Sequence, residues 1–428
     1  MRRTADHAGT ALTRTPRTRA VRTRAAVAAA VAAGVLAATV GVPAAAADPG
    51  SPAFGWLAPE GEVHRDVAVS GSGRVFSVSL PEPGTQDHTW LEHGRWREWS
   101  RLEVPPISQG GVVAGPGSYA MAVTGNVSRV FDGTDWADPM TITPQQVGRS
   151  ELVGNTDGNA ALLWSAPGGR AYLSRLDRGG SWDTRRVPSV LVDAPRDVAI
   201  NNAGKVTVVW AAPQGTTSEI RRSVLQPGAT TWSPAVRIGT VNDPRPRLTL
   251  VTEGAGRETL LAGNKLWRQA SSTRLPTYRF RTSVRAELAA SDTLTRLVWS
   301  GQTGGTFHFY TRSAAADWGP QVRVWSESGS PECPNSPWIG VGMVPGGRSY
   351  LALVVRTDVG ETTDSCGGPY ETLVTLDRFD GVLNRSGGLD SAWPTTPFQI
   401  VGGTGGPIVV EHEVGNWTPD WRLQFFDR

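Results

Sequence analysis

Short stretches in which apolar and polar residues alternate follow one another along most of the chain. Residues 197–200, 206–210, 219–225 and 232–238 are four such stretches, with turn-forming residues at 201–204 and 226–228 between them. Alternation over four to eight residues, interrupted by Gly, Asn and Pro, is typical of short antiparallel strands. The pattern predicts a four-stranded sheet at 196–238 and no amphipathic helix of useful length after Pro49.

The same four-strand pattern recurs along the chain. Its units cover residues 67–102, 112–142, 151–182, 196–238, 248–284, 287–324 and 338–401. A marker aromatic returns about every 40 to 50 residues, at Trp96/Trp99, Trp136, Trp182, Trp232, Tyr278, Trp318 and Trp393. Such a period indicates an all-β fold, a β-propeller of about seven four-stranded blades. Two stacked β-sandwiches are the alternative, which the even spacing disfavours.

The ends of the repeat carry strand-like segments that lack a complete unit. Residues 54–57 stand alone before the first unit, and 407–414 and 421–426 follow the last one. A propeller must close to remove its open sheet edges, and pairing these segments would close it as an eighth, composite blade. We therefore expect one domain over residues 48–428, with a stretched seventh unit at 330–401 and closing strands at 402–428.

The recurring tryptophans have two interpretations. One aromatic at the same place in every unit fills the space between adjacent sheets, whereas tryptophans that stack on sugars would lie on loops. The regular position favours packing.

The first 47 residues are typical of a secretory signal peptide. Seven arginines precede an apolar, alanine-rich run at 25–42, and a small-residue cleavage site, Ala45-Ala46-Ala47, follows the run. A membrane anchor is the alternative, but the run is short for a span of about 20 residues. We expect cleavage near Ala47 and secretion from a bacterium, with no membrane span in the mature chain, which we expect to be a monomer.

Removal of this segment changes the charge of the protein. The whole chain carries +3, but residues 1–47 carry seven Arg and one Asp, so the remainder is near −3. The basic balance therefore belongs to the leader, and nucleic-acid binding has no global support. The sequence predicts no metal site and no cofactor.

The two cysteines, Cys333 and Cys366, form an even pair in a chain expected to be exported. In an oxidising compartment such a pair predicts one disulfide. Two free buried thiols are the alternative.

Residues Asp177, Gly179, Ser181 and Trp182 resemble the latter part of the Asp-box of bacterial sialidase-type propellers, S-x-D-x-G-x-[ST]-W, with Arg175 in the place of the serine. Residues 131–136 resemble it more loosely. In that family the box is a hairpin turn on the outside of a blade, so the resemblance implies a fold and not catalysis. Sialidase chemistry would need a Tyr–Glu pair, and the adjacent Tyr370 and Glu371 would point apart on a strand.

An arginine precedes the first strand in five of the seven units. These residues are Arg65, Arg149, Arg196, Arg247 and Arg285. In a meandering blade these positions share one end of the sheets with the loops between second and third strands. We call it the Arg-bearing end, and Cys333 and Cys366 are expected there too. Guanidinium groups converging on one cleft would bind a carboxylate, sulfate or phosphate. Alternatively, they pair with nearby acids and hold adjacent blades together.

The sequence thus favours a secreted, non-catalytic propeller that binds an anionic glycan, a cell-envelope component or a protein. A sialidase-like glycoside hydrolase or lyase acting on extracellular carbohydrate is the alternative, and no catalytic residue can be assigned.

Overall fold

The structure is a computed structural model, and it divides the chain into two compact units, Met1–Ala47 and Asp48–Arg428. It describes residues 53–55, 62–81, 89–95, 98–105, 110–191, 194–268, 277–279, 286–303, 306–314, 318, 321–328, 338–343, 349–356, 369–375, 382–386, 399–403, 406–414 and 419–425. The predicted signal peptide lies outside the described residues and stays a prediction.

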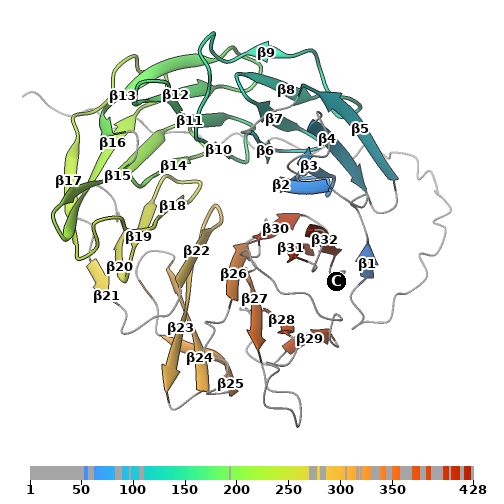
Figure 1. Ribbon diagram of the computed structural model, residues 1–428, viewed down its shortest axis with the longest axis vertical. Helices are drawn as coiled ribbons and strands as arrows, with labels where there is room; N and C mark the ends of the chain where they lie inside the picture. Colours follow the sequence, from blue (N-terminus) through green and yellow to red (C-terminus); the bar gives the residue numbers. More distant parts are fainter. Residues whose placement is uncertain are drawn as a thin grey trace, which may run out of the picture. The chain divides into compact units, whose positions relative to one another are not determined.

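The described strands of the second unit form eight four-stranded antiparallel sheets. The first three are β2 (Glu62–Val69), β3 (Val75–Pro81), β4 (Thr89–Arg95) and β5 (Glu98–Val104); β6 (Gly110–Ala114), β7 (Ala120–Thr124), β8 (Val127–Phe131) and β9 (Met140–Thr141); and β10 (Ser150–Gly154), β11 (Ala160–Ala166), β12 (Arg170–Leu176) and β13 (Asp183–Leu191). In each of these three sheets the strands lie in chain order, each beside the next (Figure 1).

Three further sheets follow along the chain. They are β14 (Arg196–Ile200), β15 (Val206–Gln214), β16 (Thr217–Leu225) and β17 (Val236–Val241); β18 (Leu248–Thr252), β19 (Glu258–Ala262), β20 (Lys265–Arg268) and β21 (Thr277–Arg279); and β22 (Ala286–Ala290), β23 (Thr295–Thr303), β24 (Thr306–Ala314) and β25 (Val322–Ser328). The next sheet holds β26 (Trp338–Met343), β27 (Ser349–Arg356), β28 (Pro369–Thr375) and β29 (Val382–Ser386).

The eighth sheet joins both ends of the second unit. Its order is β1 (Ala53–Gly55), β32 (Pro419–Phe425), β31 (Gly406–Val414) and β30 (Gln399–Gly403). Strand β1 pairs antiparallel with β32, with Ala53 opposite Phe425. This is the composite sheet that the strand-like segments at the two ends predicted.

The boundary of the stretched seventh unit differs from the prediction. Residues Val382–Ser386 are the fourth strand of the seventh sheet. Residues Gln399–Gly403 begin the eighth sheet, although the predicted seventh unit extends to residue 401. The marker Trp393, which lies outside the described residues, follows this fourth strand and does not precede it.

The sheet β14–β17 shows how the sequence specifies each unit. The β-branched strand β15 is buried from Val206 to Ala211, as expected for a strand covered on both faces. The turn before it places Gly204 at φ 78°, a left-handed conformation that glycine adopts without a Cβ clash. Local pattern and turn chemistry therefore agree in this unit.

First strands of successive sheets contact one another along the whole series. The series runs from β2 through β6, β10, β14, β18, β22 and β26 to β30, and β30 contacts β2 again. The first strands therefore form a closed series of contacts, and each sheet touches two neighbours.

Four of the recurring tryptophans pack between neighbouring sheets. Trp136, Trp182, Trp232 and Trp318 each lie shortly before a fourth strand and contact apolar clusters that include residues of the preceding sheet. Trp232, for example, packs on the cluster that contains Leu163 and Leu173 of β11 and β12. At these four positions the contacts agree with the packing interpretation.

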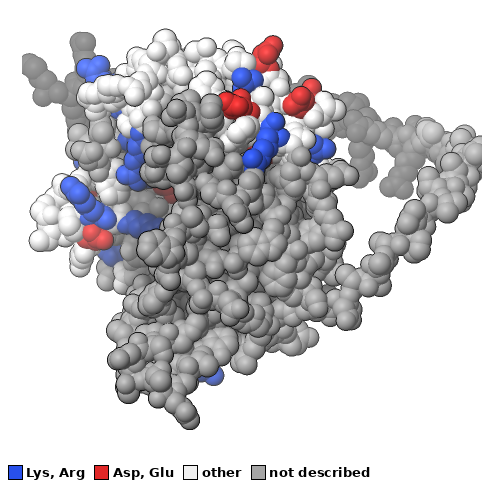
Figure 2. Space-filling model, turned by 45° about the vertical axis from the view of Figure 1, so that its right-hand side comes forward, with Lys and Arg blue, Asp and Glu red and all other residues white. Residues whose placement is uncertain are grey.

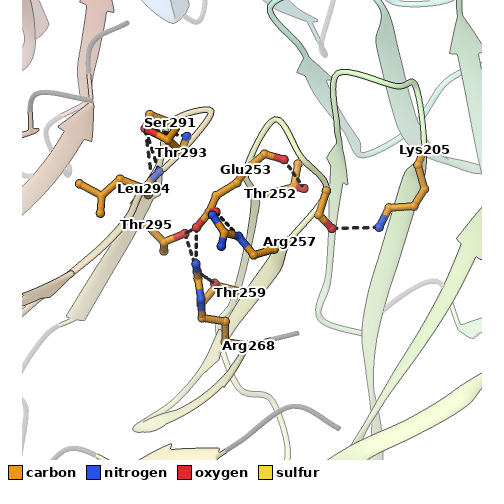
Figure 3. A network of polar contacts seen from close by, with 11 residues as sticks. Lys205, Thr252, Glu253, Arg257, Thr259, Arg268, Ser291, Thr293, Leu294 and Thr295 are labelled. Atoms are coloured by element: carbon orange, nitrogen blue, oxygen red, sulfur yellow. Dashed lines mark hydrogen bonds and ion pairs between the residues drawn. The ribbon is translucent and has the colours of Figure 1, made fainter. Parts of the chain in front are cut away.

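A buried ionic network joins sheet β18–β21 to sheet β22–β25 (Figure 3). The carboxylate of Glu253 accepts hydrogen bonds from the Arg268 guanidinium at 2.5 Å and from the Thr295 hydroxyl at 2.7 Å. Arg268 also donates to Thr259 Oγ1, and Arg257 donates to the second Glu253 oxygen at 2.6 Å. Glu253 and Arg268 are 0% and 1% exposed, so this ion pair is shielded from water.

Candidate functional site: the Arg-bearing end of the sheets

Three of the five predicted arginines have described side chains. Arg149 and Arg247 directly precede β10 and β18, and Arg196 is the first residue of β14. Arg65 lies in β2, but its side chain is outside the described part of the structure, as is all of Arg285. An anion site formed by all five therefore stays a prediction.

Two of these arginines bind partners on neighbouring sheets. Arg247 forms a bidentate ion pair with Glu287 of β22, with N–O distances of 2.9 and 3.3 Å. Arg196 donates from Nη2 to the backbone carbonyl of Arg149, 3.2 Å away. These contacts connect adjacent sheets, which favours the interpretation of the arginines as clamps at these two positions.

Two carboxyl groups, those of half-buried Glu151 and buried Asp197, lie among the same arginines. Asp197 is 7% exposed, and its carboxylate accepts the N–H of Val198 at 2.7 Å and the N–H of Leu250 at 2.5 Å. Glu151 of β10 is close enough for the negative charge of Asp197 in β14 to act on it. Because Leu250 belongs to β18, Asp197 connects two consecutive sheets.

Burial and mutual repulsion determine the charge of this pair. Burial and the neighbouring Asp197 carboxyl raise the pKa of Glu151 to about 10. Burial also raises the pKa of Asp197, whereas Glu151 and the two backbone N–H groups oppose that effect. The pair therefore holds a proton more tightly than an exposed carboxyl does.

Asp66 makes the corresponding backbone contacts at the junction between β2 and β6. Its carboxylate accepts the N–H of Val67 at 3.0 Å and the N–H of Val112 at 2.9 Å. The neighbouring position of β6 is Gly111, and a Cβ there would lie 3.1 Å from Asp66 Oδ2. Asp66 and Asp197 thus each hold the first strand of the next sheet, through a carboxylate that accepts a backbone N–H of that strand.

An open pocket of about 550 Å³ lies at the same end of sheet β10–β13. Its lining residues are Gln145, Gln146, Ala166, Pro167, Gly168, Arg170 and Tyr172. They come from the segment before β10 and from the turn between β11 and β12. Ser150, the first residue of β10, pairs with Trp164 near the end of β11, which places both segments at the Arg-bearing end.

Backbone contacts hold these two segments together. The N–H of Gly148 donates to the carbonyl of Ser165, and the N–H of Ser165 donates to the carbonyl of Arg149. A Cβ on Gly148 would lie 3.0 Å from the Ser165 carbonyl oxygen, a tight contact that glycine avoids. Backbone hydrogen bonds therefore fix the position of one wall of the pocket.

Polar groups and an aromatic ring combine in the pocket. Gln145 and Gln146 are exposed amides, and Arg170 is exposed with no ion pair among the described residues. Tyr172 is half-buried and stacks on buried Trp164, with ring centroids 4.8 Å apart and planes at 20°. Amides, a guanidinium and a fixed aromatic ring can bind a polar ring-shaped ligand that carries a negative charge.

The sequence analysis missed these pocket residues because no motif links them. Gln145 and Gln146 lie more than 20 residues before Arg170, and they come together only through the pairing of β10, β11 and β12. The turn sequence Pro167-Gly168-Gly169 was the available signal, since it marks a loop at the Arg-bearing end.

The Asp-box-like residues lie at the opposite end of this sheet, in the hairpin between β12 and β13. The N–H of Gly180 donates to the Asp177 carbonyl at 2.8 Å, and Gly179 has φ 76°. Ser181 is exposed and Trp182 is half-buried beside β13. The four residues form a hairpin turn, as the resemblance implied, and they lie far along the strands from the pocket.

The remaining sequence predictions concern the disulfide, metal binding and a membrane span. Cys333 and Cys366 lie outside the described residues, so the disulfide stays a prediction. Where the structure is described, no cluster of three His, Cys, Asp or Glu side chains is arranged to hold a metal ion. The same residues include no helix with the length and apolar character needed to span a membrane.

Charged side chains of both signs are interspersed on the described surface. Figure 2 shows basic and acidic groups next to one another on the described part of the face in view. The described part of this face is therefore not uniformly basic.

Comparisons with known proteins give structural matches only. No family model matches the sequence, and no curated protein matches it. A polysaccharide lyase of family PL25, an ulvan lyase bound to -[GlcA(1-4)Rha3S]-, aligns at 8% identity and a TM-score of 0.45, covering 78% of this chain and 97% of the lyase. The polysaccharide lyase Uly1 aligns at 11% identity and a TM-score of 0.43, covering 78% and 94%.

A lectin from Aleuria aurantia also aligns with the chain. A mutant of this lectin in complex with Fucalpha1-6GlcNAc matches at 11% identity and a TM-score of 0.40, covering 74% of this chain and 93% of the lectin. The lectin is a six-bladed β-propeller, whereas the described strands of this chain form eight sheets.

Proposed function

We propose that this chain is a secreted, non-catalytic β-propeller of eight blades that binds an acidic carbohydrate at its Arg-bearing end. The eight four-stranded sheets and the closed series of first-strand contacts support the propeller. Secretion rests on the predicted signal peptide. The acidic carbohydrate would belong to a cell-envelope component or to an extracellular polymer.

The pocket beside Tyr172 is the observation that carries this proposal. Its volume of about 550 Å³ suits one or two sugar rings, and ligand sites commonly range from about 300 to 1,000 Å³. The ring of Tyr172 offers an apolar surface for the C–H face of a sugar. Gln145 and Gln146 supply donors and acceptors for hydroxyl groups.

Arg170 makes an acidic sugar the favoured ligand. A guanidinium binds a carboxylate or sulfate through two parallel hydrogen bonds, and both bonds are available where no acid already occupies it. By contrast, Arg196 and Arg247 already bind the Arg149 carbonyl and Glu287. We therefore assign the contact with the acidic group of the ligand to Arg170 and not to the recurring arginines.

The hydrolase or lyase alternative has less support. An acid–base pair in a glycosidase faces the substrate from two sides, with about 5 to 10 Å between the carboxyl groups. In the described pair, Asp197 acts on Glu151 and accepts two backbone N–H groups. The Asp197 carboxylate is therefore engaged in holding strands together.

A glycan array probed with the purified protein tests this function. The wild type should retain glycans with uronic acid or sulfated sugars, and raised salt should weaken this retention because one ion pair contributes to it. Arg170→Gln should lower the affinity for acidic glycans at least tenfold. Tyr172→Ala should lower the affinity for every bound glycan by a similar factor.

Arg245→Gln is the matched control. Arg245 is an exposed arginine that precedes β18, at the same end of a different sheet. Its removal changes the net charge as Arg170→Gln does, but it leaves the pocket intact, so binding should be unchanged. Equal losses for Arg170→Gln and Arg245→Gln would show general charge attraction, and an array with no signal for the wild type would refute glycan binding.

A further inference from the structure

His93 of β4 lies in a nest of aromatic side chains between sheet β2–β5 and sheet β6–β9. The residue is 6% exposed, and its ring centroid lies 4.4 Å from that of Phe131, 6.2 Å from that of Phe76 and 6.4 Å from that of Trp136. Phe76 is in β3 of the same sheet, whereas Phe131 and Trp136 belong to the next sheet. The imidazole therefore takes part in the packing of the two sheets against each other.

Arg74, which directly precedes β3, makes a polar contact with this ring. Its Nη1 lies 3.0 Å from His93 Nδ1, and its guanidinium carbon lies 5.1 Å from the ring centroid of Phe131. A guanidinium has only donors, so Nδ1 must accept this hydrogen bond and the ring proton must be on Nε2. The contact between the two side chains therefore requires a neutral imidazole.

Burial and charge both favour the neutral form of His93. Burial in the aromatic nest lowers its pKa below the ordinary 6.5, and the positive charge of Arg74 lowers it further. The carboxylate of Asp135, in the turn before Trp136, opposes these effects and is the smallest of the three. A proton on Nδ1 would remove the acceptor of the hydrogen bond and place two cations side by side among apolar rings.

Charged side chains elsewhere on these strands bind partners of their own. Glu92 of β4 accepts a hydrogen bond from the Ser77 hydroxyl at 2.9 Å and forms an ion pair with Arg101 of β5 at 2.9 Å. In the next sheet, Asp132 accepts hydrogen bonds within its own turn, and Arg129 donates to a backbone carbonyl. These groups are engaged in contacts that do not include the imidazole.

We propose that His93 is an acid-sensitive switch between sheet β2–β5 and sheet β6–β9. At neutral pH its uncharged ring packs on both sheets and accepts the hydrogen bond from Arg74. In mildly acidic surroundings the ring takes up a proton, the hydrogen bond breaks, and this junction opens more often than others. The switch does not involve the pocket at Tyr172, so its test is independent of the proposed carbohydrate site.

The direction of the pH effect follows from proton linkage. The pKa of His93 is lower in the folded protein than the ordinary 6.5, so an opened chain binds the proton more tightly than the closed junction does. The contribution of the neutral ring to stability is complete above pH 6.5. It decreases as the pH falls below that value and is fully lost once the pH has fallen through the lowered pKa of the folded state.

Hydrogen exchange of the wild-type protein, followed by mass spectrometry at about pH 7.5 and pH 5, measures the opening, because ordinary carboxyl groups remain largely ionised in this range. After correction for intrinsic exchange rates, peptides covering β4 and β8 should exchange roughly threefold to thirtyfold faster at the lower pH, the upper limit set by an opened histidine with a pKa of 6.5. Peptides covering β16 and β19, from sheets whose sequences contain no histidine, are the internal reference and should change less than about twofold. Equal acceleration in both sets would overturn the proposal.

Two substitutions at position 93 test whether this residue is responsible. His93→Phe keeps an aromatic ring in the nest, His93→Asn keeps an acceptor for Arg74, and neither side chain titrates. In both variants the response of β4 and β8 to pH should fall below about twofold. The control is His308→Gln, in β24 of a different sheet, which should keep the wild-type response. A wild-type response in the variants at position 93 would overturn the switch, and if one of them does not fold, the other decides.

Discussion

The indole N–H of Trp182 donates a hydrogen bond to Ser128 Oγ, 2.7 Å away, across the boundary between sheets β10–β13 and β6–β9. Trp136 and Trp232 occupy the same place in their own sheets, but their indole nitrogens have no acceptor among the described residues. One tryptophan of the repeat thus combines apolar packing with a polar contact, and the other two rely on packing.

This difference predicts unequal costs for the same substitution. Replacement of Trp182, Trp136 or Trp232 by Phe removes a similar volume each time, but only Trp182→Phe also leaves the Ser128 hydroxyl without its donor. We expect Trp182→Phe to lower the free energy of unfolding by about 1 kcal/mol more than the other two. Urea denaturation of the three variants measures this difference. Equal losses would show that the hydrogen bond contributes nothing to stability.

The ion pair of Glu253 and Arg268 should be costly to break. Glu253→Gln would leave the buried Arg268 guanidinium without its carboxylate, and we expect a loss of about 3 to 5 kcal/mol. The double variant Glu253→Gln with Arg268→Met removes the buried charge and should recover part of this loss. Thermal unfolding of the single and double variants checks both expectations. A double variant less stable than Glu253→Gln alone would contradict this explanation.

A larger residue at position 111 is expected to destabilise the fold because Asp66 approaches Gly111 closely. A Cβ would lie 3.1 Å from Asp66 Oδ2 and 3.3 Å from Leu152 Cβ. We expect Gly111→Ala to lower the free energy of unfolding by about 1 to 3 kcal/mol, the usual range for overpacking. In an Asp66→Ala background the extra cost should be smaller, and urea denaturation of the four proteins in this cycle measures it.

The turn at Asp132 should lose support only in strong acid. One Asp132 oxygen accepts the N–H and the hydroxyl of Thr134 and the N–H of Asp135, and these bonds lower its pKa to about 2. The folded-state pKa is below the ordinary 3.8, so the stabilisation is present above that value and is lost as the pH falls through about 2. Denaturation midpoints between pH 5 and 2 should fall more for the wild type than for Asp132→Asn. Parallel decreases would contradict the role of this carboxylate.

Local pattern was sufficient to predict most of the fold. Strands β14, β15 and β16 match the stretches predicted at 197–200, 206–210 and 219–225, because alternation and turn residues are local signals. The fourth strand begins at Val236 and not at Trp232, because the tryptophan packs on the preceding sheet before the strand starts. In this sheet the marker aromatic therefore identifies the fourth strand but not the residue at which that strand begins.

The candidate site was harder to predict because it depends on contacts between sheets. The sequence predicted Arg149, Arg196 and Arg247 just before their first strands and named pairing with acids as one alternative. Arg149 and Arg247 lie there, and Arg196 is the first residue of its strand. The sequence did not show that Arg247 would bind Glu287, since the two residues belong to different sheets. Charge partners in this fold are set by the packing of neighbouring sheets, and single-strand patterns do not contain that information.

The pairing of β1 with β32 has a consequence for the order of assembly. Because Ala53 lies opposite Phe425, β1 cannot find its partner until β32 has left the ribosome. The eighth sheet is therefore completed only after the strands of the seven other sheets have been synthesised. The same proximity means that a short peptide joining residues 53 and 425, with new ends opened in the exposed turn at Gly215, should give a circularly permuted chain with an intact eighth sheet.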